Sequence, residues 1–269
     1  MSDLKAQVLD KSLPPFKRLT LLMEMLRSPQ GCNWDRKQTH ETLLPYLIEE
    51  TYEVVDSIAY QRYAELKEEL GDLLCQVVFH AQLARERGEF DIDDAVTHLV
   101  DKLIRRHPHV FGRPRDLSPQ EVRDQWEKIK VNSGEKPSVL SGLPRSMPAL
   151  TMAFRMGEKA GGFGFDWSDP TEVMEKVEEE LKELRQEIFS PSREGGDRIE
   201  SEVGDLLFAT ASLARKLSVD PELALKRALD KFRRRFERME GEIASRGGTF
   251  DEYTLEQLEQ LWQELKRTE

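Results

Sequence analysis

One helical pattern that carries acidic residues on its apolar side occurs twice in this 269-residue chain. In the later copy, apolar residues recur every three or four positions over 173–188 and again over 199–217, with a breaker-rich stretch between the two segments. This spacing predicts two helices that pack as an antiparallel hairpin. Glu180 and Glu202 fall on the apolar lines of these helices, so we expect both carboxylates to face inward.

Each of these two helices carries a further acid one turn on. Glu183 follows Glu180 and Asp205 follows Glu202 at the i, i+3 spacing, which places both side chains on one side of a helix. Two like charges about 5 Å apart repel by roughly 3 kcal/mol at an effective dielectric of about 20, so a cation is expected among the four carboxylates. Because no His or Cys is interleaved, the ligand set favours Mg²⁺, or Mn²⁺, over zinc or iron.

The earlier copy repeats the same placement. Residues 47–58 align with 177–188, and residues 66–76 align with 199–209. A solvated face is the common reason for acids on a single helix, but it gives no reason for the same four positions to recur. The four acids of the earlier copy, in matching order, are Glu50, Glu53, Glu69 and Asp72.

The repeat continues beyond the acidic hairpins. Residues 100–106 match 229–235 in their basic positions, and 126–130 match 262–266 in a Trp and a Lys. One chain therefore holds two tandem copies of a helical domain, and the predicted fold class is all-α. The linker is assigned to a stretch of Gly, Ser and Pro that lacks helical periodicity. The predicted boundaries are 1–132 for the first domain, 133–148 for the linker and 149–269 for the second domain.

Composition narrows the classes of function. The net charge of −11 argues against a surface that coats nucleic acid, so no nucleic-acid partner is expected. No apolar run approaches the roughly 20 residues needed to span a bilayer, and the N-terminal segment lacks the apolar stretch of a signal peptide. We expect a cytoplasmic protein without a membrane partner. Cys32 and Cys75 form no CxxC pair and are expected to be free thiols, with Cys75 in the core.

Several other features have an ordinary structural interpretation. His107 and His109 flank a proline with no acid beside them, which favours capping or packing over metal ligation. Trp34 is expected to be a packing anchor rather than a ligand contact. The glycine-rich stretch 160–167 lacks the spacing of a phosphate-binding loop and is expected to be a turn. Further helices are predicted at 16–27, 90–106, 117–130, 221–246 and 253–269.

Several motifs in order resemble one known family over nearly the whole chain. The motifs are EExxE followed by ExxD on the next helix, LGDLLCQVVFHAQ and RRHPHVF in the first copy, and GFDW, EVGDLLFA and DKFRRRF in the second. They resemble the MazG family of nucleoside triphosphate pyrophosphohydrolases. The resemblance implies an all-α, Mg²⁺-dependent homodimer that splits nucleoside triphosphates into the monophosphate and pyrophosphate, with broad base tolerance, and clears nucleotide pools. Hairpins that bury one face each would pair into dimers resembling four-helix bundles.

The resemblance also implies roles for individual residues. The metal ligands would be Glu180, Glu183, Glu202 and Asp205, and the nucleotide contacts would be Lys176, Glu179, Lys231, Arg235, Trp262 and Lys266. The first-copy counterparts would be Glu50, Glu53, Glu69 and Asp72 for metal, with Lys102, Arg106, Trp126 and Lys130 for nucleotide. Glu179 is the first candidate for the base that accepts a proton from water. Because Tyr46 stands where the second copy has Lys176, we expect the second domain to carry most of the catalysis.

Two other classes of protein share parts of this pattern. A redox di-metal bundle would need Glu-x-x-His pairs, and both acidic motifs lack the His. A regulatory protein that binds nucleotide and metal without turnover would keep the same residues, so this alternative stays open at the level of sequence.

Overall fold

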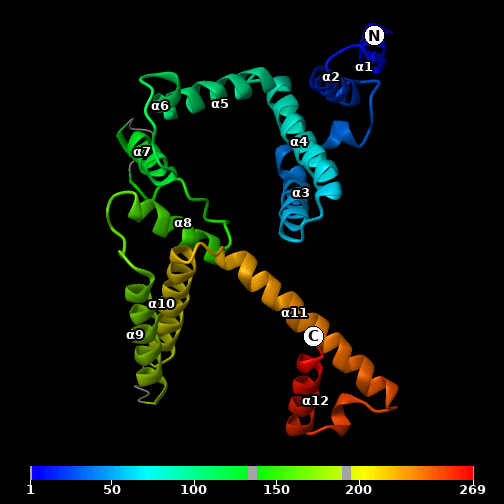
Figure 1. Ribbon diagram of the computed structural model, residues 1–269. Coiled ribbons are helices and arrows are strands. Elements are labelled where there is room, and N and C mark those ends of the chain that lie inside the picture. Colours follow the sequence, from blue (N-terminus) through cyan, green and yellow to red (C-terminus); the bar gives the residue numbers. More distant parts are fainter. Residues whose placement is uncertain (1, 133–137, 190–194, 269) are drawn as a thin grey trace. The chain divides into compact units, whose positions relative to one another are not determined.

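The computed structural model describes residues 2–132, 138–189 and 195–268, and every regular element within these ranges is a helix (Figure 1). The all-α prediction is therefore confirmed. The chain divides into two compact units between Asp116 and Leu117. We call residues up to Asp116 the first unit and those from Leu117 the second unit.

The first unit is built around the hairpin of α3 and α4, against which α2 and α5 pack. Helix α1 packs on α2, and the short helix α6 follows α5 directly. The elements are α1 (Ser2–Leu9), α2 (Pro15–Arg27), the 3₁₀ helix η1 (Asp35–Lys37), α3 (His40–Ala59), α4 (Tyr63–Glu86), α5 (Ile92–Arg106) and α6 (Pro108–Phe111).

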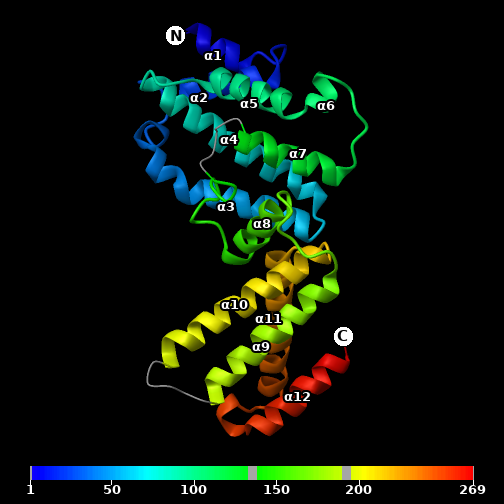
Figure 2. The same cartoon turned by 90° about the vertical axis from the view of Figure 1, so that its left-hand side faces the viewer.

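The second unit repeats the hairpin as α9 and α10, which lie side by side in both views (Figures 1 and 2). Helix α8 packs on α10 and α11, and α12 packs chiefly on α11. The elements are α7 (Pro119–Asn132), α8 (Ala149–Gly161), α9 (Pro170–Phe189), α10 (Gly195–Lys216), α11 (Pro221–Ser245), η2 (Phe250–Glu252) and α12 (Leu255–Arg267).

The helix starts follow from short polar residues in the sequence. Thr39 and Asp91 form capping boxes that satisfy free backbone N–H groups at the starts of α3 and α5. The Asp220 side chain accepts a hydrogen bond from the Leu223 backbone N–H, and Pro221 occupies the first position of α11. Thr254 caps α12 in the same way as Thr39 caps α3. Local chemistry thus sets where the helices begin.

Each unit has its own apolar core. In the first unit the buried residues come from α2, α3 and α4, and Cys75 packs against them as predicted. In the second unit they come from α11 and α12, and the Trp262 ring packs against them. The buried residues are Met23, Leu43, Val78, Phe79 and Leu83 in the first core, and Met239, Ile243, Leu261 and Leu265 in the second.

Some elements differ from the sequence-based expectations. Helix α8 was not predicted, and neither was α1. Helix α7, which we assigned to the first domain, clusters with the second unit, while the boundaries at 132 and 148 stay predictions. Of the linker expected at 133–148, the first five residues lie outside the described ranges, and the remainder forms turns before α8.

The glycine-rich stretch before α9 forms a turn, as predicted. Gly164 has a φ of +85°, a conformation that favours glycine. Asp166 accepts two hydrogen bonds from the Arg215 guanidinium at 2.9 and 2.5 Å, and it also pairs with Lys216 at 2.8 Å. These contacts fasten the turn to the end of α10, so its role here is structural.

A membrane-spanning helix is not found among the described residues, because none of their helices combines the required length with the required hydropathy.

A buried ion pair joins α7 to α8 within the second unit. The Lys159 side chain is 4% exposed, and its ammonium lies 3.4 Å from the Glu127 carboxylate and 3.1 Å from the Val139 carbonyl oxygen. Glu127 also pairs with Lys130. Burial alone would raise the pKa of Glu127, but these two lysines outweigh it and lower the pKa below 4.5.

Glu127→Gln should therefore destabilise the second unit. The change leaves the Lys159 ammonium buried without its carboxylate, and removing one partner of a buried pair costs about 3 kcal/mol or more. Calorimetric unfolding would show the loss, with Glu121→Gln on the same helix as the control. Because the folded-state pKa of Glu127 is lowered, the stabilisation is present above pH 4.5 and is lost as the pH falls below it. Unfolding unchanged at neutral pH would contradict the argument.

Candidate active site

The second hairpin brings three of its four predicted acids together. Glu180 projects from α9, and Glu202 and Asp205 project from α10. One carboxylate oxygen from each lies within 4.8 Å of the others. Glu180 is only 7% exposed, as expected for an acid on the apolar line of its helix. We call these three residues the second acid cluster.

The first hairpin forms the equivalent group. Glu50 on α3 meets Glu69 and Asp72 on α4, again with carboxylate oxygens within 4.8 Å of one another. We call these residues the first acid cluster. The repeat seen in the sequence is therefore a repeat in three dimensions.

The fourth acid of each copy lies next to its cluster rather than within it. Burial, and then the charges of Asp72 and Glu53, raise the pKa of Glu50. In the second unit, burial and then the charges of Glu183, Asp205 and Glu180 raise the pKa of Glu202. Glu53 and Glu183 are thus close enough to act on the clusters, although both are exposed.

The composition of the clusters fits a hard divalent cation. All of the donors are carboxylate oxygens, the ligands that Mg²⁺ and Mn²⁺ accept. Burial and, after it, repulsion between carboxylates raise the pKa of Glu50 and Glu202, and a bound cation would relieve the repulsion. The described residues therefore support a divalent metal site in each hairpin.

Lys176 occupies one edge of the second acid cluster. Its ammonium lies 2.8 Å from Glu180 and 2.9 Å from Glu179. Hydrogen bonds to Glu180 and then Glu179 raise the pKa of Lys176, so it remains charged over the physiological range. Sequence reasoning predicted Lys176 as a nucleotide contact and did not anticipate this pairing, although the i, i+4 spacing permits it.

The first copy has aromatic rings at the matching edge. Tyr46 takes the position of Lys176, and its ring meets that of Trp34 edge-on with centroids 5.8 Å apart. Trp34 is 50% exposed and, through this contact with Tyr46, is a packing residue that remains half exposed. It lies just before η1, in a connection that reaches the surface. The two clusters therefore differ in charge at their edges.

Four of the six predicted nucleotide contacts of the second copy lie on α11 and α12 rather than on the hairpin. The Arg235 guanidinium lies 5.9 Å from the centre of the Trp262 ring, and Phe232 packs on the same ring at 5.1 Å. Lys231 and Lys266 are exposed on these two helices. Helix α12 packs chiefly on α11, and this packing brings Arg235 and Trp262 together. Lys176 belongs to a different helix, α9, and contacts the acid cluster.

The first-copy counterparts fall in different units. Lys102 and Arg106 lie one turn apart on α5 of the first unit. Trp126 and Lys130 lie on α7 of the second unit, with the ammonium 5.9 Å from the ring centre. His107, as expected, is a capping residue, and its Nδ1 donates a hydrogen bond to the Leu103 carbonyl 2.6 Å away.

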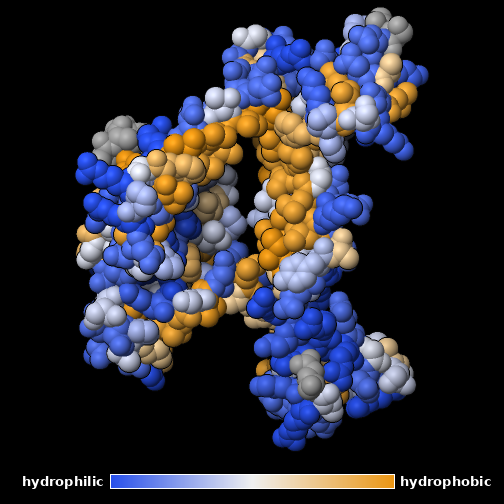
Figure 3. Space-filling view, turned by 45° about the horizontal axis from the view of Figure 1, so that its top comes forward, coloured by the Kyte–Doolittle hydropathy of each residue, from blue (hydrophilic) through white to orange (hydrophobic). Residues whose placement is uncertain are grey.

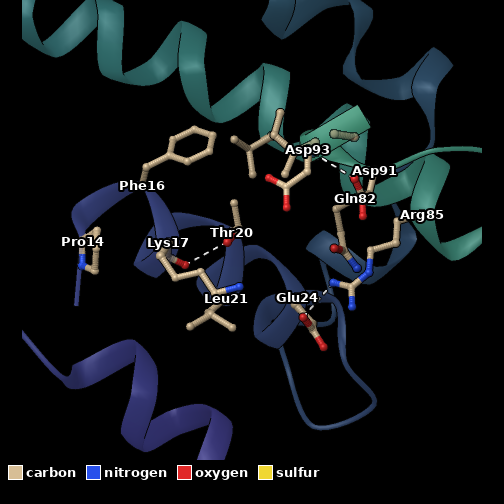
Figure 4. Close-up of a pocket in the computed structure, with 13 residues that line it drawn as sticks. Pro14, Phe16, Lys17, Thr20, Leu21, Glu24, Gln82, Arg85, Asp91 and Asp93 are labelled. Atoms are coloured by element: carbon tan, nitrogen blue, oxygen red, sulfur yellow. Dashed lines mark hydrogen bonds and ion pairs between the residues drawn. The ribbon is translucent and has the colours of Figure 1, made fainter. Parts of the chain in front are cut away.

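A pocket of about 360 Å³ lies in the first unit between α2, α4 and the start of α5 (Figure 4). Its lining includes the apolar Leu21 and Val78 and the basic Lys17 and Arg85. Arg85 already pairs with Glu24 at 2.8 Å. None of the acid-cluster residues lines this pocket, so it is not the predicted metal site.

Comparisons with known proteins agree with the repeat. The family model described as "MazG nucleotide pyrophosphohydrolase domain" matches residues 38–111 and 168–239, which together span more than half of the chain. Both matches contain an acidic hairpin. Each acid cluster therefore lies inside a matched domain.

Two curated relatives are similar over nearly their whole length. The "Nucleoside triphosphate pyrophosphohydrolase/pyrophosphatase MazG" of Thermotoga maritima is 51% identical over 253 residues, covering 93% of this chain and 95% of that protein. The "Nucleoside triphosphate pyrophosphohydrolase" of Escherichia coli K12 is 44% identical over 260 residues, covering 94% and 97%. With two matched domains and relatives of this identity and coverage, the chain belongs to the MazG nucleotide pyrophosphohydrolase family.

Proposed function

We propose that this protein hydrolyses nucleoside triphosphates to the monophosphate and pyrophosphate, with broad base tolerance, and thereby clears nucleotide pools in the cytoplasm. The observation that carries the proposal is the second acid cluster, where Glu180, Glu202 and Asp205 converge inside a matched family domain. The names of the relatives supply the reaction class.

Glu180, Glu183, Glu202 and Asp205 would hold Mg²⁺ or Mn²⁺ in the second unit, and Glu50, Glu53, Glu69 and Asp72 would do so in the first. When bound, the cation supplies charge neutralisation for the phosphate oxygens and a more acidic water molecule. The acids fix its position, because they project from paired helices rather than from loops.

The remaining residues would handle the proton, the leaving group and the base. Glu179 is exposed and lies outside the three-acid cluster, where it pairs with Lys176 at 2.9 Å, and its carboxylate would accept the proton of the attacking water. Lys231 and Arg235 would stabilise the negative charge that develops on the leaving pyrophosphate. Trp262 would stack on the base, which every nucleobase permits, and Lys266 would bind phosphate.

The products of the reaction test this proposal. Purified protein incubated with Mg²⁺ and each of the common nucleoside triphosphates in turn is expected to release pyrophosphate and monophosphate. Release of orthophosphate would refute the reaction class. Tight nucleotide binding without turnover would favour the regulatory alternative.

We also propose that the protein is a homodimer. Many apolar side chains on the hairpins and the long helices are exposed, including Leu181 at 54% and Leu207 at 53%. Figure 3 shows apolar side chains, in orange, gathered in strips along helices. Such extended apolar surface is typical of an interface with another copy.

Leu207→Glu should weaken or abolish the dimer. A carboxylate buried between two copies would be desolvated without a partner. Light scattering at micromolar concentration would report the mass, with Leu255→Glu at the exposed start of α12 as the control. A monomer in the unmodified protein would contradict the proposal.

A further inference from the structure

The two acid clusters differ in one respect that bears on how each would take up a cation. In the second unit, the Lys176 ammonium lies 2.8 Å from a Glu180 oxygen, and Glu180 belongs to the three-acid cluster. A positive charge is therefore already present at that cluster when no metal is bound. In the first unit the matching residue is Tyr46, which carries no charge and faces Trp34 instead.

A divalent cation bound to Glu180 would lie close to this ammonium. The two positive charges would repel each other, and both would compete for the same carboxylate. Glu180 is 7% exposed, so its carboxylate has little access to water as an alternative partner. The Lys176 side chain is 37% exposed and ends a flexible four-carbon chain, so the lysine is the partner that can move.

We propose that Lys176 is an internal counterion of the second acid cluster, which a divalent cation must displace, and that the displaced ammonium then becomes available to the polyphosphate of the substrate. This inference rests on the proposed function. It predicts that the second cluster binds metal more weakly than it would without Lys176. It also predicts that metal binds before nucleotide in the second unit. In the first unit Tyr46 takes the place of this lysine, so the same order is not predicted there.

Binding of Mn²⁺ alone to the full-length protein, followed by the electron paramagnetic resonance signal of free Mn²⁺, tests the proposal without any turnover. Glu50→Ala leaves the second cluster as the intact one, and Glu180→Ala leaves the first. In the Glu50→Ala background, adding Lys176→Met is expected to tighten Mn²⁺ binding about tenfold, since a hydrogen-bonded charge pair of this kind no longer competes. The matched control is Lys182→Met, which removes another exposed lysine of the same helix.

The reciprocal change belongs to the first cluster. In the Glu180→Ala background, Tyr46→Lys is expected to weaken Mn²⁺ binding by a similar factor. Unchanged or weaker Mn²⁺ binding in the Lys176→Met protein would overturn the inference while leaving the proposed function intact. Failure of both backgrounds to bind Mn²⁺ would instead refute the metal sites themselves.

A chemical readout separates displacement from a general effect on α9. Lys176 is held by two carboxylates in the free protein, so an amine-acylating reagent should label it slowly. Mg²⁺ should raise its labelling several-fold, measured by mass spectrometry with Lys182 as the internal reference. Equal labelling with and without Mg²⁺ would contradict displacement.

Discussion

Pyrophosphate release is expected to stop completely in EDTA and to return when Mg²⁺ is added back in excess. Without a cation, the carboxylates of the second acid cluster repel one another and would repel a polyphosphate as well. Lys176 supplies one positive charge there, which cannot offset three carboxylates. The assay is continuous detection of pyrophosphate, with circular dichroism to show that the helices persist in EDTA. If turnover were undiminished in the chelator, the proposed metal requirement would be refuted.

Because the substrate also binds Mg²⁺, a second measurement assigns the requirement to the protein. Asp205→Asn removes one negative charge from the cluster while keeping the size of the side chain. The concentration of Mg²⁺ that gives half-maximal activity is expected to rise by about tenfold, since one charged ligand is lost. Glu200→Gln, an exposed acid on the same helix, is the control and should leave this concentration unchanged.

Glu180→Ala is expected to reduce pyrophosphate release roughly a hundredfold or more, whereas Glu50→Ala should leave most of it. The second unit has Lys176 beside its cluster, and a charge-assisted hydrogen bond to phosphate is worth roughly 1.5–3 kcal/mol. The first unit has Tyr46 instead, and its loss of such a bond corresponds to about ten- to a hundredfold in rate. The two single variants would be compared at saturating Mg²⁺.

The basic helices also favour the second unit as the more active one. Helix α11 carries three consecutive arginines at 233–235, whereas α5 ends at Arg106 before Pro108. If Glu50→Ala abolished turnover and Glu180→Ala spared it, the roles of the two units would be reversed. Comparable partial losses would mean that both sites work. Loss of helical content in either variant would be detected by circular dichroism before its activity is interpreted.

The hairpins and their acids could be predicted because they depend on local periodicity. Glu180 sits between apolar residues one turn away on either side, and the structure accordingly buries it. The same reasoning placed Glu69 and Asp72 opposite Glu50. The repeat strengthened the prediction, because acids on a solvated face have no reason to recur at the same inward-facing positions in both copies.

Other features depend on tertiary contacts that periodicity does not report. Helix α8 owes its place to packing on α10 and to the buried pair of Lys159 with Glu127. Because Glu127 lies on α7, the same pair connects α7 to α8, and α7 therefore belongs to the second unit. Trp34 was expected to be a packing residue, and it packs on Tyr46, but periodicity does not report that its neighbours leave it half exposed. The spacing of Lys176 allows its ammonium to contact solvent, substrate or Glu180, and spacing alone does not predict that it pairs with Glu180.

The position of the oxygen atom taken from water tests the central claim most directly. In the proposed reaction, water attacks the α-phosphorus and pyrophosphate leaves, so hydrolysis in H₂¹⁸O should place the label in the nucleoside monophosphate. Mass spectrometry of both products would show it, with the Glu180→Ala protein as the control for background hydrolysis. Label found in pyrophosphate would mean attack at the β-phosphorus, and label found in orthophosphate would mean a different reaction; either result would contradict the account.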